Sequence, residues 1–121
     1  MHPRLKSFLV ILALVTSIAL PFSRASAATA WCSSAFGAPC NTWTIPANNQ
    51  QHYVRIEVAA NYASFYLKDK QHNKVVFAAK TGFNVLRPWT RTIFGLYGPA
   101  YFGHLGWCDP AFSGSMTITN G

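Results

Sequence analysis

The carboxylates are the first groups to test for acid–base chemistry, and the chain has three: Glu57, Asp69 and Asp109. Hydrolysis of a glycosidic bond needs two carboxyl groups that flank it. Each of the three has a simpler structural role. Glu57 falls on the polar side of an alternating run, Asp69 lies in a polar loop between two lysines, and Asp109 precedes a proline at a turn-starting position. The sequence therefore predicts no catalytic pair.

A second group of reactive types is Cys108 with His104 and Asp109, which has the composition of a thiol nucleophile with its base. His104 falls inside a β-rich run, however, and Cys108 is a candidate for a disulfide. The spacing lacks the paired Cys-x-x-Cys unit of a structural zinc site. The G-x-S-x-G, H-E-x-x-H and phosphate-loop motifs are absent from the sequence. We therefore expect no enzyme activity, no metal site and no cofactor.

Aromatic side chains are the more informative group, at 15% of the chain. A small domain cannot bury all of them, and exposed amphipathic rings mark contact surfaces on which sugar rings can stack. The segment from Phe83 to Arg91 combines aromatic and guanidinium groups around Pro88, which predicts a binding loop. The alternative is that Leu86 and Trp89 cover one end of the fold while the arginines are solvated. The candidate ligand-binding residues are Trp89, Trp107, Tyr97, Tyr101, Arg87 and Arg91.

Residues 1–27 have the three parts of a secretory signal peptide. Arg4 and Lys6 precede an uncharged apolar run over residues 8–20, and small residues at 25–27 suit cleavage. The apolar run is shorter than the roughly 20 residues that cross a bilayer. The sequence therefore predicts a secreted, extracellular protein without a stable membrane anchor.

Residues 28–121 form one predicted domain. Three of the ten Lys and Arg residues lie in the predicted signal peptide, so its removal lowers the net charge from +7 to +4. A mild positive charge favours anionic surfaces without selecting one of them. No basic stretch alternates with aromatics as a nucleic-acid groove requires. We therefore expect no nucleic-acid partner.

All three cysteines, Cys32, Cys40 and Cys108, lie in this domain, and export permits disulfides. We favour a Cys32–Cys40 bridge, because Gly37 and Pro39 suit the tight reversal that it would close. A bridge from either residue to Cys108 would close a longer loop and restrict the unfolded chain more. Spacing alone does not fix the connectivity. A disulfide-linked dimer through the odd cysteine is an open alternative.

Short β-rich runs separated by turn residues fill the domain. Residues 53–58 alternate apolar and polar types, which predicts a half-buried strand. Residues 62–68 and 74–80 flank a polar tip in which His72 is interpreted as a solvated loop residue, and this pattern is typical of a hairpin. The other predicted strands are residues 42–45, 91–97, 100–107 and 115–119.

This spacing predicts an all-β fold, a small antiparallel β-sandwich of immunoglobulin-like or Greek-key type with about seven strands. The segment Leu96–Tyr101 resembles a tyrosine corner, in which a tyrosine bonds back to the backbone a few residues upstream. The predicted core residues are Val54, Ile56, Val58, Phe65, Leu67, Val75, Phe77, Ile93, Leu96, Tyr101, Met116 and Ile118.

These features together predict a secreted, non-enzymatic binding domain. Its expected partner is a surface polymer, with an extracellular polysaccharide as the first choice and another cell-surface component as the broader class. The alternative is a basic antimicrobial protein, toxin or host-directed effector. Such a protein would act on membranes or on a target protein, for example by inserting the loop from Phe83 to Arg91 into an enzyme.

Overall fold

The computed structural model describes residues 27–83, 87–111 and 113–121. The predicted signal peptide lies outside this range except for Ala27, and so does Leu86. The described residues form eight strands: β1 (Thr29–Ser34), β2 (Cys40–Asn41), β3 (Val54–Ala59), β4 (Ser64–Asp69), β5 (Lys74–Lys80), β6 (Trp89–Ile93), β7 (Tyr101–Leu105) and β8 (Gly114–Thr119). Within the same ranges, no helix is long and apolar enough to span a membrane.

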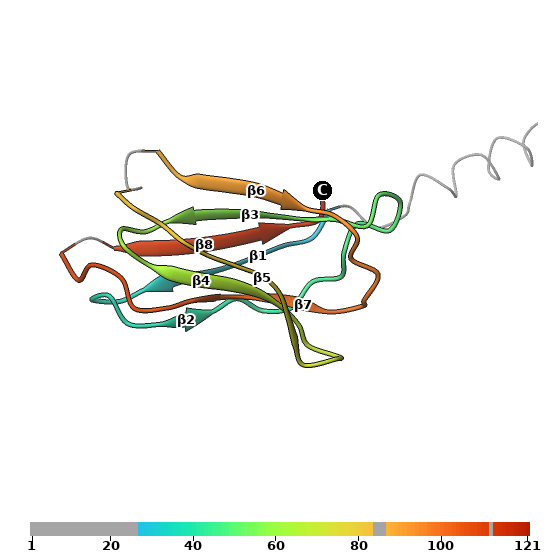
Figure 1. Cartoon of the computed structure of the whole chain (residues 1–121), viewed down its shortest axis with the longest axis horizontal. Coiled ribbons are helices and arrows are strands. Elements are labelled where there is room, and N and C mark those ends of the chain that lie inside the picture. The colour runs from blue at the N-terminus through green and yellow to red at the C-terminus, as the bar shows by residue number, and fades with distance from the viewer. Residues whose placement is uncertain (1–26, 84–86, 112) are drawn as a thin grey trace, which may run out of the picture.

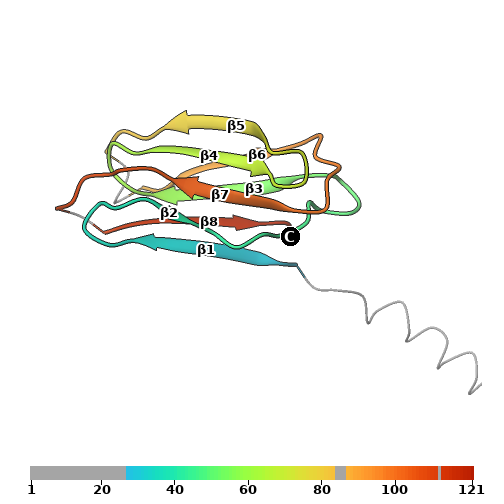
Figure 2. The same ribbon diagram turned by 90° about the horizontal axis from the view of Figure 1, so that it is seen from below.

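The strands make two four-stranded antiparallel sheets, which confirms the predicted all-β sandwich. The first sheet has the order β1-β8-β3-β6 and the second has the order β2-β7-β4-β5. Figures 1 and 2 show them as two stacked layers. The pairing of the strands is that of one long hairpin rolled over on itself. Its pairs are β1·β8, β2·β7, β3·β6 and β4·β5.

Two further pairs, β3·β8 and β4·β7, join the rolled hairpin into sheets. This arrangement is the jelly-roll form of the Greek-key sandwich. It has eight strands, and its order differs from the four-against-three arrangement of an immunoglobulin domain. The additional strand is β1, which pairs with β8 over its whole length.

The strand bounds differ from the sequence prediction near the N-terminal end of the domain and at β6, which spans Trp89–Ile93 rather than residues 91–97. In β1 the buried side chains are Ala30, Cys32 and Ser34, which are too small and too polar to mark a strand by their types. Residues 42–45 do not form a continuous strand. Strand β2 ends at Asn41, and Ile45 makes an isolated bridge to Tyr101.

The core fills the space between the two sheets, and eleven of the twelve predicted core residues pack in it or against it. The prediction for Val75 was wrong, since its side chain is 46% exposed. The reason is a register shift between Leu67 and Lys68, which sets Val75 opposite Lys68 rather than opposite an inward-facing residue. A bulge of this kind turns the following side chains to the other face of the sheet.

The long edge of the sandwich formed by β1 and β2 is closed by a disulfide and by two tryptophan rings. At the β1/β2 edge a Cys32–Cys40 disulfide joins the sheets, which confirms the favoured bridge. Outside it the rings of Trp31 and Trp43 meet edge to face, 5.5 Å between centroids. The remaining thiol, Cys108, is buried and donates a hydrogen bond to the Ser34 hydroxyl at 3.3 Å.

The short ends of the sandwich are distinct. We call one the loop end; its loops comprise residues 35–39, 60–63, 81–88 and 106–113, of which 84–86 and 112 are not described. The opposite, hairpin end carries residues 70–73 and 94–100. The domain termini also lie at the hairpin end, where Ala28 N–H donates to the side-chain oxygen of Asn120 at 2.7 Å (Figure 1).

Candidate functional site

The six predicted ligand-binding residues do not gather in one place. Tyr97 is 77% exposed at the hairpin end, and Trp107 is 72% exposed at the loop end, so β7 lies between them. Tyr101 is 2% exposed, which makes it a core residue and removes it from any open stacking surface. A single aromatic site built from these rings is therefore not present.

Trp89 and the arginines belong to the β5/β6 edge. The Trp89 ring packs on Phe65 and Phe77, with centroid distances of 4.7 and 5.8 Å. The Arg91 guanidinium lies 5.3 Å from the centre of the Phe77 ring, a cation–π contact. Arg87 is exposed just before β6. Trp89 thus closes the β5/β6 edge of the sandwich rather than one of its ends, where the alternative interpretation placed it together with Leu86.

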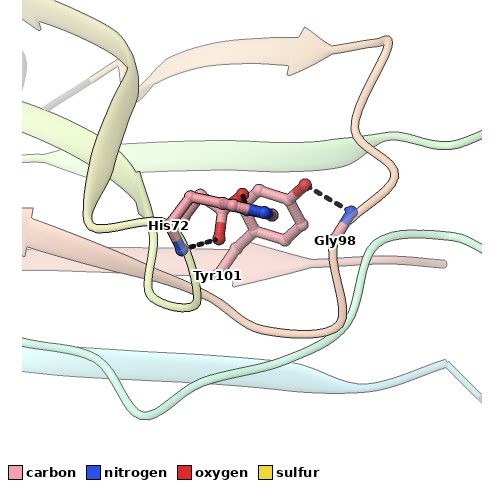
Figure 3. Close-up of polar contacts among 4 residues, drawn as sticks. His72, Gly98 and Tyr101 are labelled. Carbon is pink, nitrogen blue, oxygen red and sulfur yellow. Dashed lines mark hydrogen bonds and ion pairs between the residues drawn. The ribbon is translucent and has the colours of Figure 1, made fainter.

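The tyrosine corner is confirmed at the hairpin end. The Tyr101 hydroxyl accepts a hydrogen bond from Gly98 N–H at 2.7 Å (Figure 3). A Cβ atom on Gly98 would lie 2.8 Å from that hydroxyl and 3.2 Å from the carboxylate of Asp69. A glycine at this position therefore lets the corner close over the buried tyrosine.

Asp69 and His72 form an ion pair that the sequence analysis missed. Asp69 is 7% exposed, and its Oδ2 lies 2.8 Å from His72 Nδ1, while its Oδ1 accepts the His72 backbone N–H at 3.1 Å. These bonds hold the pKa of Asp69 below its ordinary value, the side-chain bond from His72 having the largest effect. The sequence feature that could have revealed this contact is the Asp-x-x-His spacing within a turn.

This pair is best explained as a turn-stabilising element. An aspartate that fixes one imidazole nitrogen can orient a general base. Here, however, both oxygens of Asp69 bond to His72 three residues further on, one to its ring and one to its backbone N–H. The pair therefore fixes the β4–β5 turn.

Acid should weaken the fold through this pair. The Asp69 pKa is lowered from 3.8 in the folded state, so the ionised carboxylate with its hydrogen bonds stabilises the fold above that value. The contribution is lost as the pH falls through the lower folded-state pKa. Between about pH 5 and about pH 2 we expect the thermal midpoint of the wild type to fall more steeply than that of Asp69→Asn. Differential scanning calorimetry measures this, with Asp109→Asn as the control carboxylate; equal slopes for wild type and Asp69→Asn would contradict it.

The outer face of the second sheet brings together residues from all four of its strands. The register aligns Asn41, His104, Tyr66 and Ala78 in one row across β2, β7, β4 and β5. The rings of Tyr66 and His104 stack nearly parallel, 4.7 Å between centroids and 18° between planes. His104 Nδ1 lies 2.6 Å from the side-chain oxygen of Asn41, which fixes the imidazole.

A hollow of about 450 Å³ lies over this row; we call it the sheet-face hollow. Ala78 stands beside Tyr66 on the side away from His104 and is too small to cover the ring. Gly106 keeps β7 close to β4, since its N–H donates to the Ser64 carbonyl at 2.7 Å. The lining residues are Ser64, Phe65, Tyr66, Ala78, Ala79, Lys80, His104 and Gly106.

The lining of the sheet-face hollow combines apolar and polar groups. Its floor is mainly apolar, with one aromatic ring supported from behind, and Ser64 and Lys80 add polar groups at the margin. Such a mixture fixes a ligand by apolar contact and orients it by a few hydrogen bonds. No group of three or more His, Cys, Asp or Glu within the described ranges is arranged to hold a metal ion.

Sequence reasoning does not single out Tyr66, and it considers His104 as a partner of Cys108 rather than of Tyr66. Strand alternation places both on the outer side, but their contact depends on the pairing of β4 with β7. Comparison with known proteins adds no assignment: no protein-family model matches the sequence, and no curated protein matches it either.

Proposed function

We propose that this protein is a secreted, non-enzymatic binding domain for an extracellular polysaccharide, and that the sheet-face hollow is its binding site. The supported ring of Tyr66 carries this proposal. His104 covers one face of the ring and Asn41 fixes His104, while the small Ala78 leaves the other side open. The apolar C–H face of a sugar ring fits such a surface, and its hydroxyl groups can reach Ser64 and Lys80.

The placement of the carboxylates supports a binding role over hydrolysis. Glu57 is exposed in the middle of β3, in the first sheet. Asp69 is bonded within the β4–β5 turn, and Asp109 accepts the Ala111 N–H at 3.0 Å in a turn at the loop end. Three carboxylates on three separate parts of the fold do not flank one bond. The signal-peptide pattern of residues 1–27 supports export.

The test is retention of residues 28–121, which contain both sheets and the core, on insoluble polysaccharides. We expect salt-resistant retention on at least one of chitin, cellulose and peptidoglycan, because ring stacking is not screened by ions. Tyr66→Ala should weaken it about ten- to hundredfold, the usual range for loss of one aromatic contact. Tyr66→Trp should keep it, because it preserves an aromatic ring.

Tyr97→Ala is the matched control, since it removes a tyrosine that is exposed at the hairpin end. It should bind like the wild type. Circular dichroism and the thermal midpoint of each variant show whether the fold is intact. Retention on none of the three polysaccharides would overturn the proposal, and so would equal retention of Tyr66→Ala and Tyr97→Ala.

A further inference from the structure

The loop end carries a second set of exposed rings, none of which lines the sheet-face hollow, and Lys80 at the end of β5 borders both regions. Among the described residues, each of its four loops, which lie together at this end (Figure 1), carries a large aromatic residue that is exposed. These residues are Phe36, Tyr62, Phe83 and Trp107, with exposed fractions of 89, 67, 57 and 72%. Exposed apolar groups that gather at one end of a small protein mark an interaction surface.

Backbone hydrogen bonds hold these loops together. The donor–acceptor pairs are Cys108 N–H to Gly37 O (3.1 Å), Tyr62 N–H to Gly82 O (2.9 Å) and Asp109 N–H to Asn61 O (3.1 Å). The first bond lies next to Phe36 and Trp107 in the sequence, the second involves Tyr62 and lies next to Phe83, and the third connects the two pairs. The backbone positions that carry the four rings are therefore held together.

Two of these aromatic residues have an unfavourable backbone conformation. Phe36 has a φ of 53° and Tyr62 has a φ of 52°. Bulky residues rarely adopt this left-handed region, and such strain persists where the surrounding structure enforces it, often at functional sites. Here it coincides with two large rings that are left in water instead of being turned into the core.

The charges at the loop end are mainly positive. Lys80 ends β5 and Arg87 lies just before β6, both with exposed side chains. The chain's carboxylates are Glu57, Asp69 and Asp109, and of these Asp109 lies at this end, where it accepts a hydrogen bond from the backbone N–H of Ala111. The loop end thus complements an anionic surface.

We propose that the loop end binds an anionic lipid bilayer. Tyr and Trp prefer the membrane–water interface, because one part of each ring is apolar and another is polar. Phe36 and Phe83 supply fully apolar rings that enter the acyl region, while Lys80 and Arg87 face the anionic headgroups. The rings stand on four separate loops, so they fit a deformable surface. The domain termini at the opposite end leave this approach open.

The test is co-sedimentation of residues 28–121 with vesicles of phosphatidylcholine containing phosphatidylserine, and with vesicles of phosphatidylcholine alone. Binding to the anionic vesicles is expected. The variant Phe36→Ser/Trp107→Ser should reduce the partition coefficient by about tenfold or more, since two apolar contacts are lost. The matched control is Phe94→Ser/Trp43→Ser, which removes the same residue types, 64% and 52% exposed, away from the loop end. It should bind like the wild type.

A spectroscopic measurement separates insertion from charge attraction. Lipids brominated on their acyl chains should quench the tryptophan fluorescence of the wild type. Trp107→Phe should still bind the vesicles but lose this quenching. Absence of vesicle binding, equal loss in the two double variants, or binding without quenching would each overturn the proposal. Because polysaccharide retention depends on Tyr66, the two proposals succeed or fail separately.

Discussion

Replacement of Gly37 by alanine should lower the free energy of unfolding by about 3 kcal/mol or more, whereas Gly95→Ala should lower it by about 1 kcal/mol. Both glycines have positive φ angles, 81° at Gly37 and 78° at Gly95. A Cβ atom at Gly95 meets nothing within 4 Å, so the cost there is backbone strain alone. At Gly37 the same atom would lie 2.5 Å from the carbonyl oxygen of Cys108 and 3.2 Å from Pro110 Cα.

The difference between the two positions arises because the obstacle at Gly37 is backbone. A side chain could rotate away, but the Cys108 backbone is held to Gly37 by its own N–H. Relief of the clash must move one loop away from the other and break that hydrogen bond. Urea unfolding of residues 28–121 and of the two variants measures both costs. Equal losses at the two glycines would contradict the close packing of these loops.

The same substitution should also affect the loop end as a surface. Gly37 and Cys108 are the neighbours of Phe36 and Trp107, so separation of the two loops disturbs the relative placement of those rings. Gly37→Ala should therefore weaken vesicle binding while leaving unchanged the proposed polysaccharide retention, which depends on Tyr66. Gly95→Ala should change neither.

The hairpin β4–β5 and strand β3 could be predicted because their signals are local. In β3 the inward positions are Val54, Ile56 and Val58, and the alternation is complete. The tyrosine corner was also predictable, since Gly98 and Tyr101 are three residues apart. Strand β1 was not, because strand propensity reflects side chains that fit a half-buried surface, and its inward residues are small.

The order of the strands could not be predicted from such signals. A rolled hairpin pairs the beginning of the domain with its end, as in the hydrogen bond between Ala28 and Asn120. Nothing in either segment specifies the other. The sequence restricts the fold to an antiparallel sandwich, and the choice of jelly roll depends on long-range pairing.

The candidate site was missed for a related reason. The prediction of which aromatic side chains are exposed rests on residue type alone, and residue type favours the tryptophans as ligand-binding residues. Trp89 is instead covered by Phe65 and Phe77 at the edge of the sandwich. Tyr66 and His104 are 38 positions apart, and their stacking follows from the register of β4 against β7. Residue type suggests that a ring can bind a ligand, but the register determines which rings remain open.

The disulfide should give the second large effect. Its removal in Cys32→Ala/Cys40→Ala should lower the free energy of unfolding by about 2.5 kcal/mol, from the loop-closure entropy of a bridge between residues eight positions apart. For a domain of this size, that corresponds to a fall in the thermal midpoint of about 10–20 °C. The bridge joins β1 of one sheet to β2 of the other, and β2 has two residues. Strand β2 pairs with β7 at those two positions, and the Trp31–Trp43 ring contact lies along the same edge as the bridge.

Reduction distinguishes this bridge from the two alternative pairings. Dithiothreitol should lower the thermal midpoint of the wild type and of Cys108→Ala by the same amount, because the Cys108 thiol is free and buried beside Ser34. It should not change the midpoint of Cys32→Ala/Cys40→Ala, which has no bridge left to reduce. If Cys108→Ala instead lost its response to the reductant, Cys108 would be a bridge partner. The join between the two sheets would then lie at the loop end, next to Trp107, rather than at the β1/β2 edge.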